Sequence, residues 1–209
     1  MARPVNADAS ATRQRILTSA TLLFSERGAK SSIREIAKDA GVSLAMVHHY
    51  FGSKDDLFAA CITGMYVELA ELRTHLIEGL TETKSIEQLF EYAIREGFRF
   101  ARAHQPAMRL MMRTVVARGA IDQARIDEFL VPFLEQASKL VSGVTGADPD
   151  SLRLPLQSLI FLNGRYAIAE IDELRLVTAT DTAEAALAAV ENHLVDNAFL
   201  SLGLKRSSH

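Results

Sequence analysis

The sequence predicts an all-α fold of about nine helices. Apolar residues recur at intervals of three and four along almost all of its 209 residues, which is the periodicity of one helix face. No alternation of apolar and polar residues is long enough for a strand, and the sequence contains no internal repeat. Glycines, prolines and capping residues separate the periodic segments, as expected of successive helices.

The first two predicted helices have clear ends. From Thr12 the apolar residues follow one helix face, and Gly28 ends the helix because glycine readily takes the left-handed conformation that follows a helix. Ser32 and Glu35 form a capping-box pattern, which predicts that a second helix begins there and closes before Gly41. The apolar face of the first helix consists of Ile16, Leu17, Ala20, Leu23 and Phe24.

The next two helices are also marked by caps. Ser43 is a good N-cap for a short helix over residues 44–51, and Gly52 stops it. Ser53 and Asp56 repeat the capping pattern, which predicts a long helix running towards Leu80. Later helices are expected over residues 85–104, 106–118, 122–144 with a kink or break at Pro132, 151–170 and 181–202.

Composition excludes several classes of protein. Hydrophobic residues make up 48% and charged residues 23%, so a disordered chain is not expected. No uncharged apolar stretch of about 18 residues exists, so neither a membrane helix nor a membrane partner is expected. The chain begins without the apolar core of a secretory signal, and the single Cys61 cannot form an internal disulfide. We therefore expect a cytoplasmic protein.

The charge is divided unevenly along the chain. The formal net charge is −3, which on its own argues against nucleic-acid binding. Residues 1–54, however, carry eight basic and four acidic side chains, a net charge of +4, whereas residues 55–209 carry a net charge of −7. A basic head on an acidic body predicts two parts with different partners, 1–54 and 55–209.

Residues 31–54 have the pattern of a helix-turn-helix, with two short helices joined at Ala40-Gly41-Val42. Val47 and Phe51 lie four apart on one stripe and are expected to pack inward. The other residues of the second helix then face outward on a rod narrow enough to enter a major groove. These outward residues are Leu44, Ala45, Met46, His48, His49 and Tyr50.

Residues 12–60 resemble the DNA-binding head of the TetR family of bacterial transcriptional repressors. The resemblance rests on Phe24-Ser25-Glu26-Arg27-Gly28, Ile33-Arg34-Glu35-Ile36-Ala37, Ala40-Gly41-Val42-Ser43, Tyr50-Phe51-Gly52-Ser53-Lys54 and Leu57-Phe58. It implies a homodimer that binds a palindromic double-stranded DNA operator. It also implies a helical body that binds a small effector, which shifts the two heads and releases the DNA.

The resemblance also implies roles for single residues. Ser31 or Ser32, together with Ser43, would contact DNA phosphates at helix starts. Tyr50 and Lys54 would contact the DNA backbone. Bases or sugars would be faced by Leu44, Ala45, Met46, His48 and His49. The sequence departs from the family at Leu44 and His48, where a basic or polar residue and an aromatic residue are usual, so thymine-methyl contacts gain weight.

Several of these residues have other interpretations. Met46 is equally consistent with packing, Lys54 with a solvated surface, and Arg3, Arg13 and Arg15 with solvation or with peripheral phosphate contacts. Adjacent His48 and His49 point about 100° apart on a helix and no third ligand is nearby, so no metal is expected.

Phenylalanines and methionines recur at helical spacing between residues 85 and 170. Any one of them is most simply a core residue, but a methionine-rich cavity can accept varied apolar ligands. Arg109, Arg113 and Gln157 are polar candidates for orienting a ligand, although both arginines also fit a solvated face. The candidate pocket consists of Phe98, His104, Met108, Met111, Met112, Phe129, Phe133, Phe161, Asn163 and Tyr166.

The last two predicted helices have broad apolar faces that fit a dimer interface. Pairing with their symmetry mates would form a four-helix bundle, and burial within one chain is the alternative. The candidate interface consists of Leu152, Leu159, Leu162, Tyr166, Leu187, Val190, Leu194 and Ala198.

The sequence therefore predicts a DNA-binding transcriptional regulator, most simply a repressor released by an apolar or amphipathic effector. A DNA-binding structural or adaptor protein without an effector is the alternative. No catalytic motif and no cofactor motif is found, so an enzyme is not expected.

Overall fold

A computed structural model of the chain describes residues 5–78 and 85–204. All regular structure in these residues is helical, as the sequence predicts. The chain forms two compact units, one of residues 1–69 and 106–119 and the other of residues 70–105 and 120–209. The first unit therefore extends beyond the predicted boundary after residue 54, because parts of two later helices complete its core.

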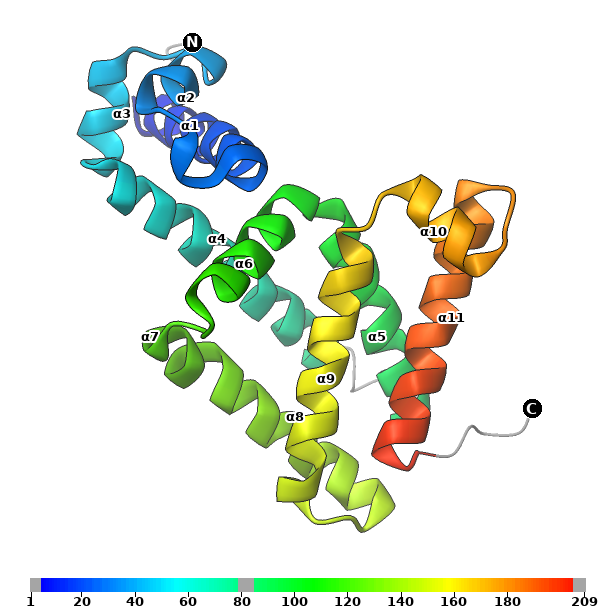
Figure 1. Ribbon diagram of the computed structural model, residues 1–209. Coiled ribbons are helices and arrows are strands. Elements are labelled where there is room, and N and C mark those ends of the chain that lie inside the picture. The colour runs from blue at the N-terminus through cyan, green and yellow to red at the C-terminus, as the bar shows by residue number, and fades with distance from the viewer. Residues whose placement is uncertain (1–4, 79–84, 205–209) are drawn as a thin grey trace. The chain divides into compact units, whose positions relative to one another are not determined.

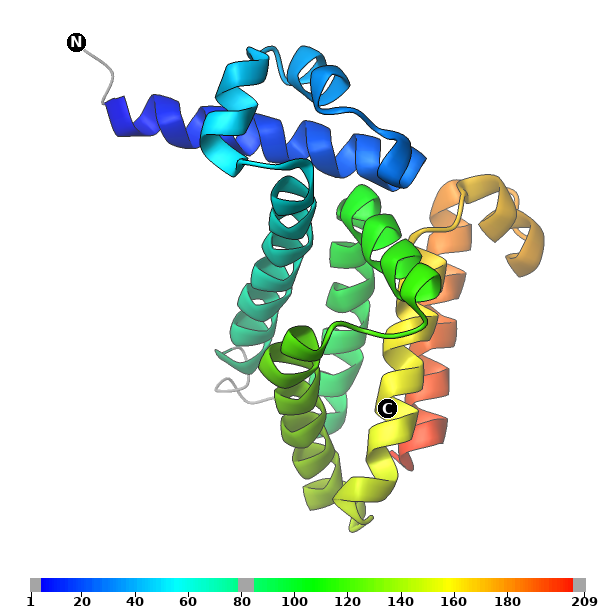
Figure 2. The same ribbon diagram turned by 60° about the vertical axis from the view of Figure 1, so that its left-hand side comes forward.

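The first unit contains five helices and one short 3-10 turn (Figures 1 and 2). Helix α1 packs against α2, and α2 packs against α3. The elements are α1 (Val5–Arg27), η1 (Gly28–Lys30), α2 (Ile33–Asp39), α3 (Leu44–Phe51), the first part of α4 (Lys54–Glu78) and α6 (Gln105–Arg118).

One apolar core holds the first unit together. Phe24 of α1, Ile36 of α2 and Val47 of α3 are fully buried in it. Leu57 of α4 and Leu110 of α6 are 0% and 2% exposed in the same core. Each of these side chains contributes about 1.5–3 kcal/mol by leaving water. The basic head therefore needs α4 and α6 to fold, which is why a boundary at residue 54 is too early.

The second unit is a helical bundle. Helices α5, α8, α9 and α11 run side by side in Figure 2, and α9 packs against the other three. The elements after the last part of α4 are α5 (Ile86–Ala103), α7 (Gln123–Arg125), η3 (Ile126–Leu130), α8 (Val131–Thr145), α9 (Pro149–Ala167), α10 (Ile171–Thr178) and α11 (Ala183–Leu202).

Two departures from the predicted helices lie in this unit. The helix expected over residues 122–144 is interrupted near Pro132, as predicted. The interruption is a π-helical turn, η3, which ends just before α8, and Pro132 lies in the first turn of α8. A wider turn is a common response where the regular hydrogen-bond ladder is interrupted, and proline cannot donate to that ladder. Helix α10 is absent from the predicted helices, because its start after Glu170 has no side-chain cap of the kind that marks the equally short α3.

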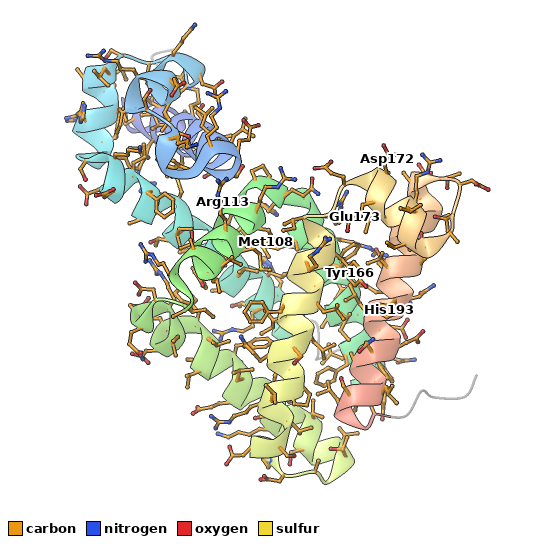
Figure 3. All side chains as sticks on the ribbon, in the orientation of Figure 1. Met108, Arg113, Tyr166, Asp172, Glu173 and His193 are labelled. Carbon is orange, nitrogen blue, oxygen red and sulfur yellow. The ribbon has the colours of Figure 1, made fainter. Side chains whose placement is uncertain are left out.

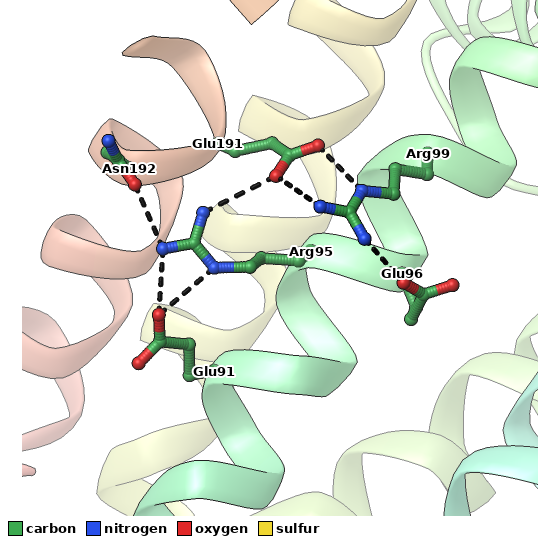
Figure 4. A network of polar contacts seen from close by, with 6 residues as sticks. All are labelled: Glu91, Arg95, Glu96, Arg99, Glu191 and Asn192. Atoms are coloured by element: carbon green, nitrogen blue, oxygen red, sulfur yellow. Dashed lines mark hydrogen bonds and ion pairs between the residues drawn. The ribbon is translucent and has the colours of Figure 1, made fainter. Parts of the chain in front are cut away.

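A polar network joins α5 to α11 (Figure 4). Arg99 donates to both carboxylate oxygens of Glu191 at 2.8 and 3.0 Å, and Arg95 donates to Glu191 at 3.4 Å. Only 12% of the Glu191 side chain is exposed, so its charge needs these partners. The hydrogen bonds and charge of Glu191 raise the pKa of the Arg99 guanidinium above its ordinary value.

The carboxyl end of α9 is held by Arg102, in the last turn of α5, and by Gln105, the first residue of α6. Arg102 donates to the carbonyl oxygens of Ala167 and Ala169 at 3.0 and 2.6 Å, and Gln105 donates to that of Ala167 at 2.9 Å. The Ala167 carbonyl ends the helix without an intrahelical partner, and Ala169 follows the helix; both residues are buried, so the two side chains satisfy groups that would otherwise be unpaired. Burial lowers the pKa of the Arg102 guanidinium, and the negative charge of Glu170, which acts to raise that pKa, only partly offsets this.

Candidate nucleic-acid interface

Capping side chains and a glycine define the helix-turn-helix. The Ser32 hydroxyl accepts from the Glu35 N–H at 3.2 Å while the Glu35 carboxylate accepts from the Ser32 N–H at 2.8 Å, a complete capping box. Gly41 turns the chain with φ +64°, which favours glycine. The Ser43 hydroxyl then accepts from the Met46 N–H at 3.2 Å and starts α3. These are the caps that the sequence predicts.

Helix α3 buries one face and leaves the other in solvent. Val47 is 0% and Phe51 9% exposed, as predicted for the inward stripe. Met46 and Tyr50 are half-buried, and Tyr50 packs against the core. The predicted base-facing residues that are exposed on α3 are Leu44, Ala45, His48 and His49.

Ser31 is not available to a phosphate. Its side chain is 1% exposed, and its hydroxyl donates to the Leu23 carbonyl at 2.8 Å. It therefore ties the segment before α2 to α1, and its predicted DNA contact is corrected to a structural role. The neighbouring Ser32 is exposed. Of the two alternatives that the resemblance allows, Ser32 is the one on the surface.

The start of α4 repeats the capping chemistry. Asp56 accepts from the Ser53 hydroxyl at 2.6 Å and from the Ser53 N–H at 3.0 Å, and these hydrogen bonds lower the pKa of the Asp56 carboxyl. In α2 the Ser32 N–H and then the Ser32 hydroxyl lower the pKa of Glu35 in the same way. Lys54, the first residue of α4, is half-buried.

Two arginines of α1 border the helix-turn-helix. The Arg13 guanidinium carbon lies 5.0 Å from the centroid of the Phe51 ring, at the end of α3. The Arg15 guanidinium lies beside the turn, 3.9 Å from where a Cβ at Gly41 would stand. Both side chains are exposed, so their charges flank the outward face of α3. Arg3 lies outside the described residues.

Arg113 of α6 has a role that the sequence did not indicate. Its guanidinium donates to the carbonyl oxygens of Ser25 and Glu26 at 3.2 and 3.0 Å (labelled in Figure 3). These carbonyls belong to the last turn of α1 and have no partner in the helix. Arg113 is thus neither simply solvated nor directed at a ligand. No local pattern identifies a donor 87 residues away from its acceptor.

The candidate pocket residues fall into both units. Met108, Met111 and Met112 are half-buried residues of α6 in the first unit, and the other seven belong to the second. Phe98 is buried at 1% exposure, whereas Phe161 is exposed at 37%. The remaining five, His104, Phe129, Phe133, Asn163 and Tyr166, are half-buried.

Two of these side chains have defined partners in the second unit. The His104 Nδ1 donates to the Phe100 carbonyl at 2.8 Å, which fixes its ring. Tyr166 of α9 meets His193 of α11 edge to face, with ring centroids 5.8 Å apart (Figure 3). The Gln157 side-chain oxygen is buried and has no hydrogen-bond partner among residues 5–78 and 85–204.

The predicted dimer interface needs a correction. Leu152, Val190, Leu194 and Ala198 are between 0% and 4% exposed, so they fill the core of their own chain and offer no surface to a partner. Leu159, Leu162, Tyr166 and Leu187 are half-buried. The same helices expose other apolar residues, namely Leu154, Ile160 and Phe161 on α9 and Leu200 on α11.

Neither a metal site nor a membrane-spanning helix is found among the described residues. They contain no group of three or more histidine, cysteine, aspartate or glutamate side chains that could hold a metal ion. Among the same residues, no helix combines the length and the apolar character needed to span a bilayer.

Comparisons with known proteins agree with this geometry. Residues 16–61 match the family model described as bacterial regulatory proteins of the tetR family. The chain is 24% identical over 156 residues to the HTH-type transcriptional dual regulator CecR of Shigella flexneri, covering 70% of each chain.

Solved structures share the whole fold. A TetR-like transcriptional regulator from Rhodococcus sp. RHA1 superposes with a TM-score of 0.68 at 22% identity, covering 98% of this chain and 100% of the other. Thermus thermophilus FadR, a TetR-family repressor in complex with lauroyl-CoA, gives 0.54 at 19% identity, covering 94% and 97%. The chain belongs to the TetR family of bacterial transcriptional regulators, and α2 and α3 form its helix-turn-helix DNA-binding motif.

Proposed function

We propose that the protein is a repressor that binds a palindromic operator as a homodimer and releases it when a small effector binds. The observation that carries the DNA-binding part is the geometry of α3. It is capped at both ends, anchored by Val47 and Phe51, and exposes Leu44, Ala45, His48 and His49 together. A rigid exposed helix of this size fits the major groove of DNA. We expect the protein to meet its operator in the bacterial cytoplasm.

The surroundings of α3 support a division of roles. Ser32, Ser43, Tyr50 and Lys54 lie at helix ends, where they suit backbone phosphates. Arg13 and Arg15 add positive charge on either side of α3. The exposed face between them carries few hydrogen-bonding groups, so Leu44, Ala45 and Met46 suit thymine methyl groups.

Selection from random duplex DNA tests this proposal. The purified protein should enrich an imperfect palindrome, and its affinity should fall about a thousandfold or more between about 50 and 200 mM salt. Lys54→Ala should weaken all duplexes nearly equally, whereas His49→Ala should change the selected sequence. An absence of enriched sequences, or identical effects of both variants across sequences, contradicts the proposal.

We place the dimer interface on the apolar surface of α9 and α11 that consists of Leu154, Ile160, Phe161 and Leu200. Leu154 and Phe161 are seven residues apart and so share one helix face. Ala185 and Ala188 of α11 are also exposed, and such small residues allow close helix approach. A palindromic operator requires two heads related by a two-fold axis, which an isologous interface provides.

Light scattering tests the interface. The wild-type chain should have the mass of a dimer at micromolar concentration, and Phe161→Glu should shift it to the monomer because a charge would be buried unpaired. Leu176→Glu is the matched control, since Leu176 is 81% exposed on α10, outside this surface. A monomeric wild type, or equal effects of both variants, contradicts the assignment.

Helix α6 supports a route from effector to DNA. It carries Met108, Met111 and Met112 of the candidate pocket and also Leu110 and Arg113, which contact the core and α1 of the first unit. A ligand that contacts these methionines and displaces α6 would therefore also disturb the hydrogen bonds between α6 and α1. The lauroyl-CoA complex of the Thermus protein supports an amphipathic effector.

A panel of acyl thioesters, fatty acids and apolar drugs, added to the complex with the selected duplex, tests release. At least one compound should lower DNA affinity, and Met111→Lys should abolish that response without changing affinity in its absence. If no compound acts and none binds the free protein, the alternative of a DNA-binding adaptor without an effector is favoured.

A further inference from the structure

His48 is held by a single hydrogen bond at the end of α3. Its Nδ1 lies 2.7 Å from the carbonyl oxygen of Gly52. Gly52 can aim this oxygen back at the ring because it adopts φ +74° and ψ −107°, a conformation open mainly to glycine. A Cβ at residue 52 would stand 3.1 Å from the Asp56 carboxylate, which also favours glycine. The orientation of the imidazole is therefore built into the turn.

This contact determines which ring nitrogen carries the proton. A carbonyl oxygen only accepts hydrogen bonds, so the Nδ1 of His48 must donate. In a neutral imidazole with a proton on Nδ1, the Nε2 is an acceptor. His48 is exposed, and the structure gives its Nε2 no partner among the described residues. The neutral ring of His48 thus offers a hydrogen-bond acceptor at its Nε2.

Its neighbour His49 differs. The His49 ring meets Tyr50 edge to face at 5.3 Å, a contact that fixes neither ring nitrogen as a donor. His49 can therefore donate or accept, whichever a base requires. The other exposed side chains of α3, Leu44 and Ala45, form no hydrogen bonds. In the neutral ring, the Nε2 of His48 is thus the one group on the exposed face of α3, between Leu44 and His49, whose role as an acceptor is set by a contact of its own side chain.

We propose that His48 is a specificity-determining residue whose Nε2 accepts a hydrogen bond from an exocyclic amino group, adenine N6 or cytosine N4, in the major groove. These amino groups are the only hydrogen-bond donors that base edges present there. Guanine O6 and N7 and thymine O4 are acceptors and repel a second acceptor. This inference rests on the proposed DNA-binding function and assigns the chemistry of one contact within it.

A pair of substitutions separates this role from a purely structural one. His48→Asn keeps a side-chain N–H near the place of Nδ1 and can still donate to Gly52, but it has nothing at the place of Nε2. His48→Gln reaches further and presents an oxygen near the place of Nε2. Thermal melting of His48→Asn, which keeps the hydrogen bond to Gly52, should match the wild type and so show that the turn is intact.

The decisive experiment is a double-mutant cycle between His48 and one amino group of the selected duplex. Site selection with His48→Asn first identifies the base pair whose preference is lost. The adenine or cytosine there is then replaced in each half-site by purine or 2-pyrimidinone, which lack the amino group. Wild-type affinity should fall about three- to tenfold per half-site, the worth of one hydrogen bond. His48→Asn should bind both duplexes equally, and His48→Gln should retain discrimination.

Three results overturn the proposal. The first is that His48→Asn keeps every sequence preference of the wild type, and the second is that it weakens all duplexes equally, as expected of a phosphate contact. Alternatively, removal of the amino group weakens the wild type and His48→Asn by the same factor. In each case the wild type still selects a sequence, so only the assignment of His48 fails. If the wild type enriches no sequence, the proposed function itself fails.

Discussion

Replacing Arg113 with alanine should loosen the DNA-binding unit although residue 113 lies far from α3 in the sequence. The guanidinium donates to the carbonyls of Ser25 and Glu26 at 3.2 and 3.0 Å. It also lies against the turn at Gly28, 3.4 Å from where a Cβ there would stand. The substitution leaves the last turn of α1 without these donors and releases α6 from α1.

The size of the effect follows from these two contacts. A hydrogen bond to a charged group contributes about 1.5–3 kcal/mol when it is shielded from water. Arg113 and Glu26 are exposed, so solvent competes and we expect a total of about 1–2 kcal/mol. That loss raises the open fraction of the unit about 5- to 30-fold.

Cys61 provides the assay. It is the only cysteine in the chain, and it is 5% exposed in the core of the same unit. Burial raises the pKa of its thiol to about 11, so the folded unit should react very slowly with thiol reagents. Labelling must wait for the unit to open, and at a fixed pH its rate reports the opening free energy.

Arg113→Ala should therefore label about 5- to 30-fold faster than the wild type. Val116→Ala is the matched control, because Val116 is on the same helix and 79% exposed, and its labelling rate should be unchanged. Equal labelling of the wild type and Arg113→Ala would refute the argument that this arginine holds α6 to α1.

Four further variants test the local structure around the helix-turn-helix. Ser31→Ala should lower stability by about 1 kcal/mol and leave the salt dependence of DNA binding unchanged, because its hydroxyl serves the core; Ser32→Ala should lower stability by a similar amount, through loss of the cap, and also weaken DNA binding. Melting curves and titrations separate the two. The folded-state pKa values of the Glu35 and Asp56 carboxyls lie below those in the unfolded chain. The ionised carboxylates therefore stabilise the fold fully at any pH above their unfolded-state pKa, and this stabilisation is lost as the pH falls through their folded-state pKa. The melting temperature should drop below about pH 4, and less steeply in the double variant Glu35→Gln, Asp56→Asn. Gly52→Ala should lower stability by about 1–3 kcal/mol, because it forces a side chain into φ +74°; an unchanged melting temperature contradicts this.

The helix-turn-helix could be predicted from the sequence because its signals are local. Ser32 with Glu35, Gly41, Ser43 and Gly52 each specify a backbone feature within a few residues. The predicted residues 44–51 are the observed bounds of α3. Helix α10 is as short as α3, but it begins after Glu170 without a side-chain capping hydrogen bond, so no local signal marks its start.

Roles that depend on tertiary contacts could not be predicted. Ser31 and Ser32 are equally polar in the sequence, and only the position of the Leu23 carbonyl turns one of them inward. Val190 and Leu194 fit an interface and a core equally well, because an apolar helix face does not identify its partner. The sequence around Arg113 fits a solvated side chain, because its hydrogen-bond acceptor at the end of α1 is 87 residues away in the chain.

The most direct test of the account is a charge on the exposed face of α3. Ala45 is exposed near the start of α3, so Ala45→Glu should fold normally, with an unchanged melting temperature. It should bind the selected duplex about a hundredfold or more weakly, because a carboxylate in the groove costs several kcal/mol. Gln136 is an exposed residue of α8, and Gln136→Glu, which adds the same charge there, should bind DNA like the wild type. Equal affinities of Ala45→Glu and Gln136→Glu would contradict DNA recognition by α3.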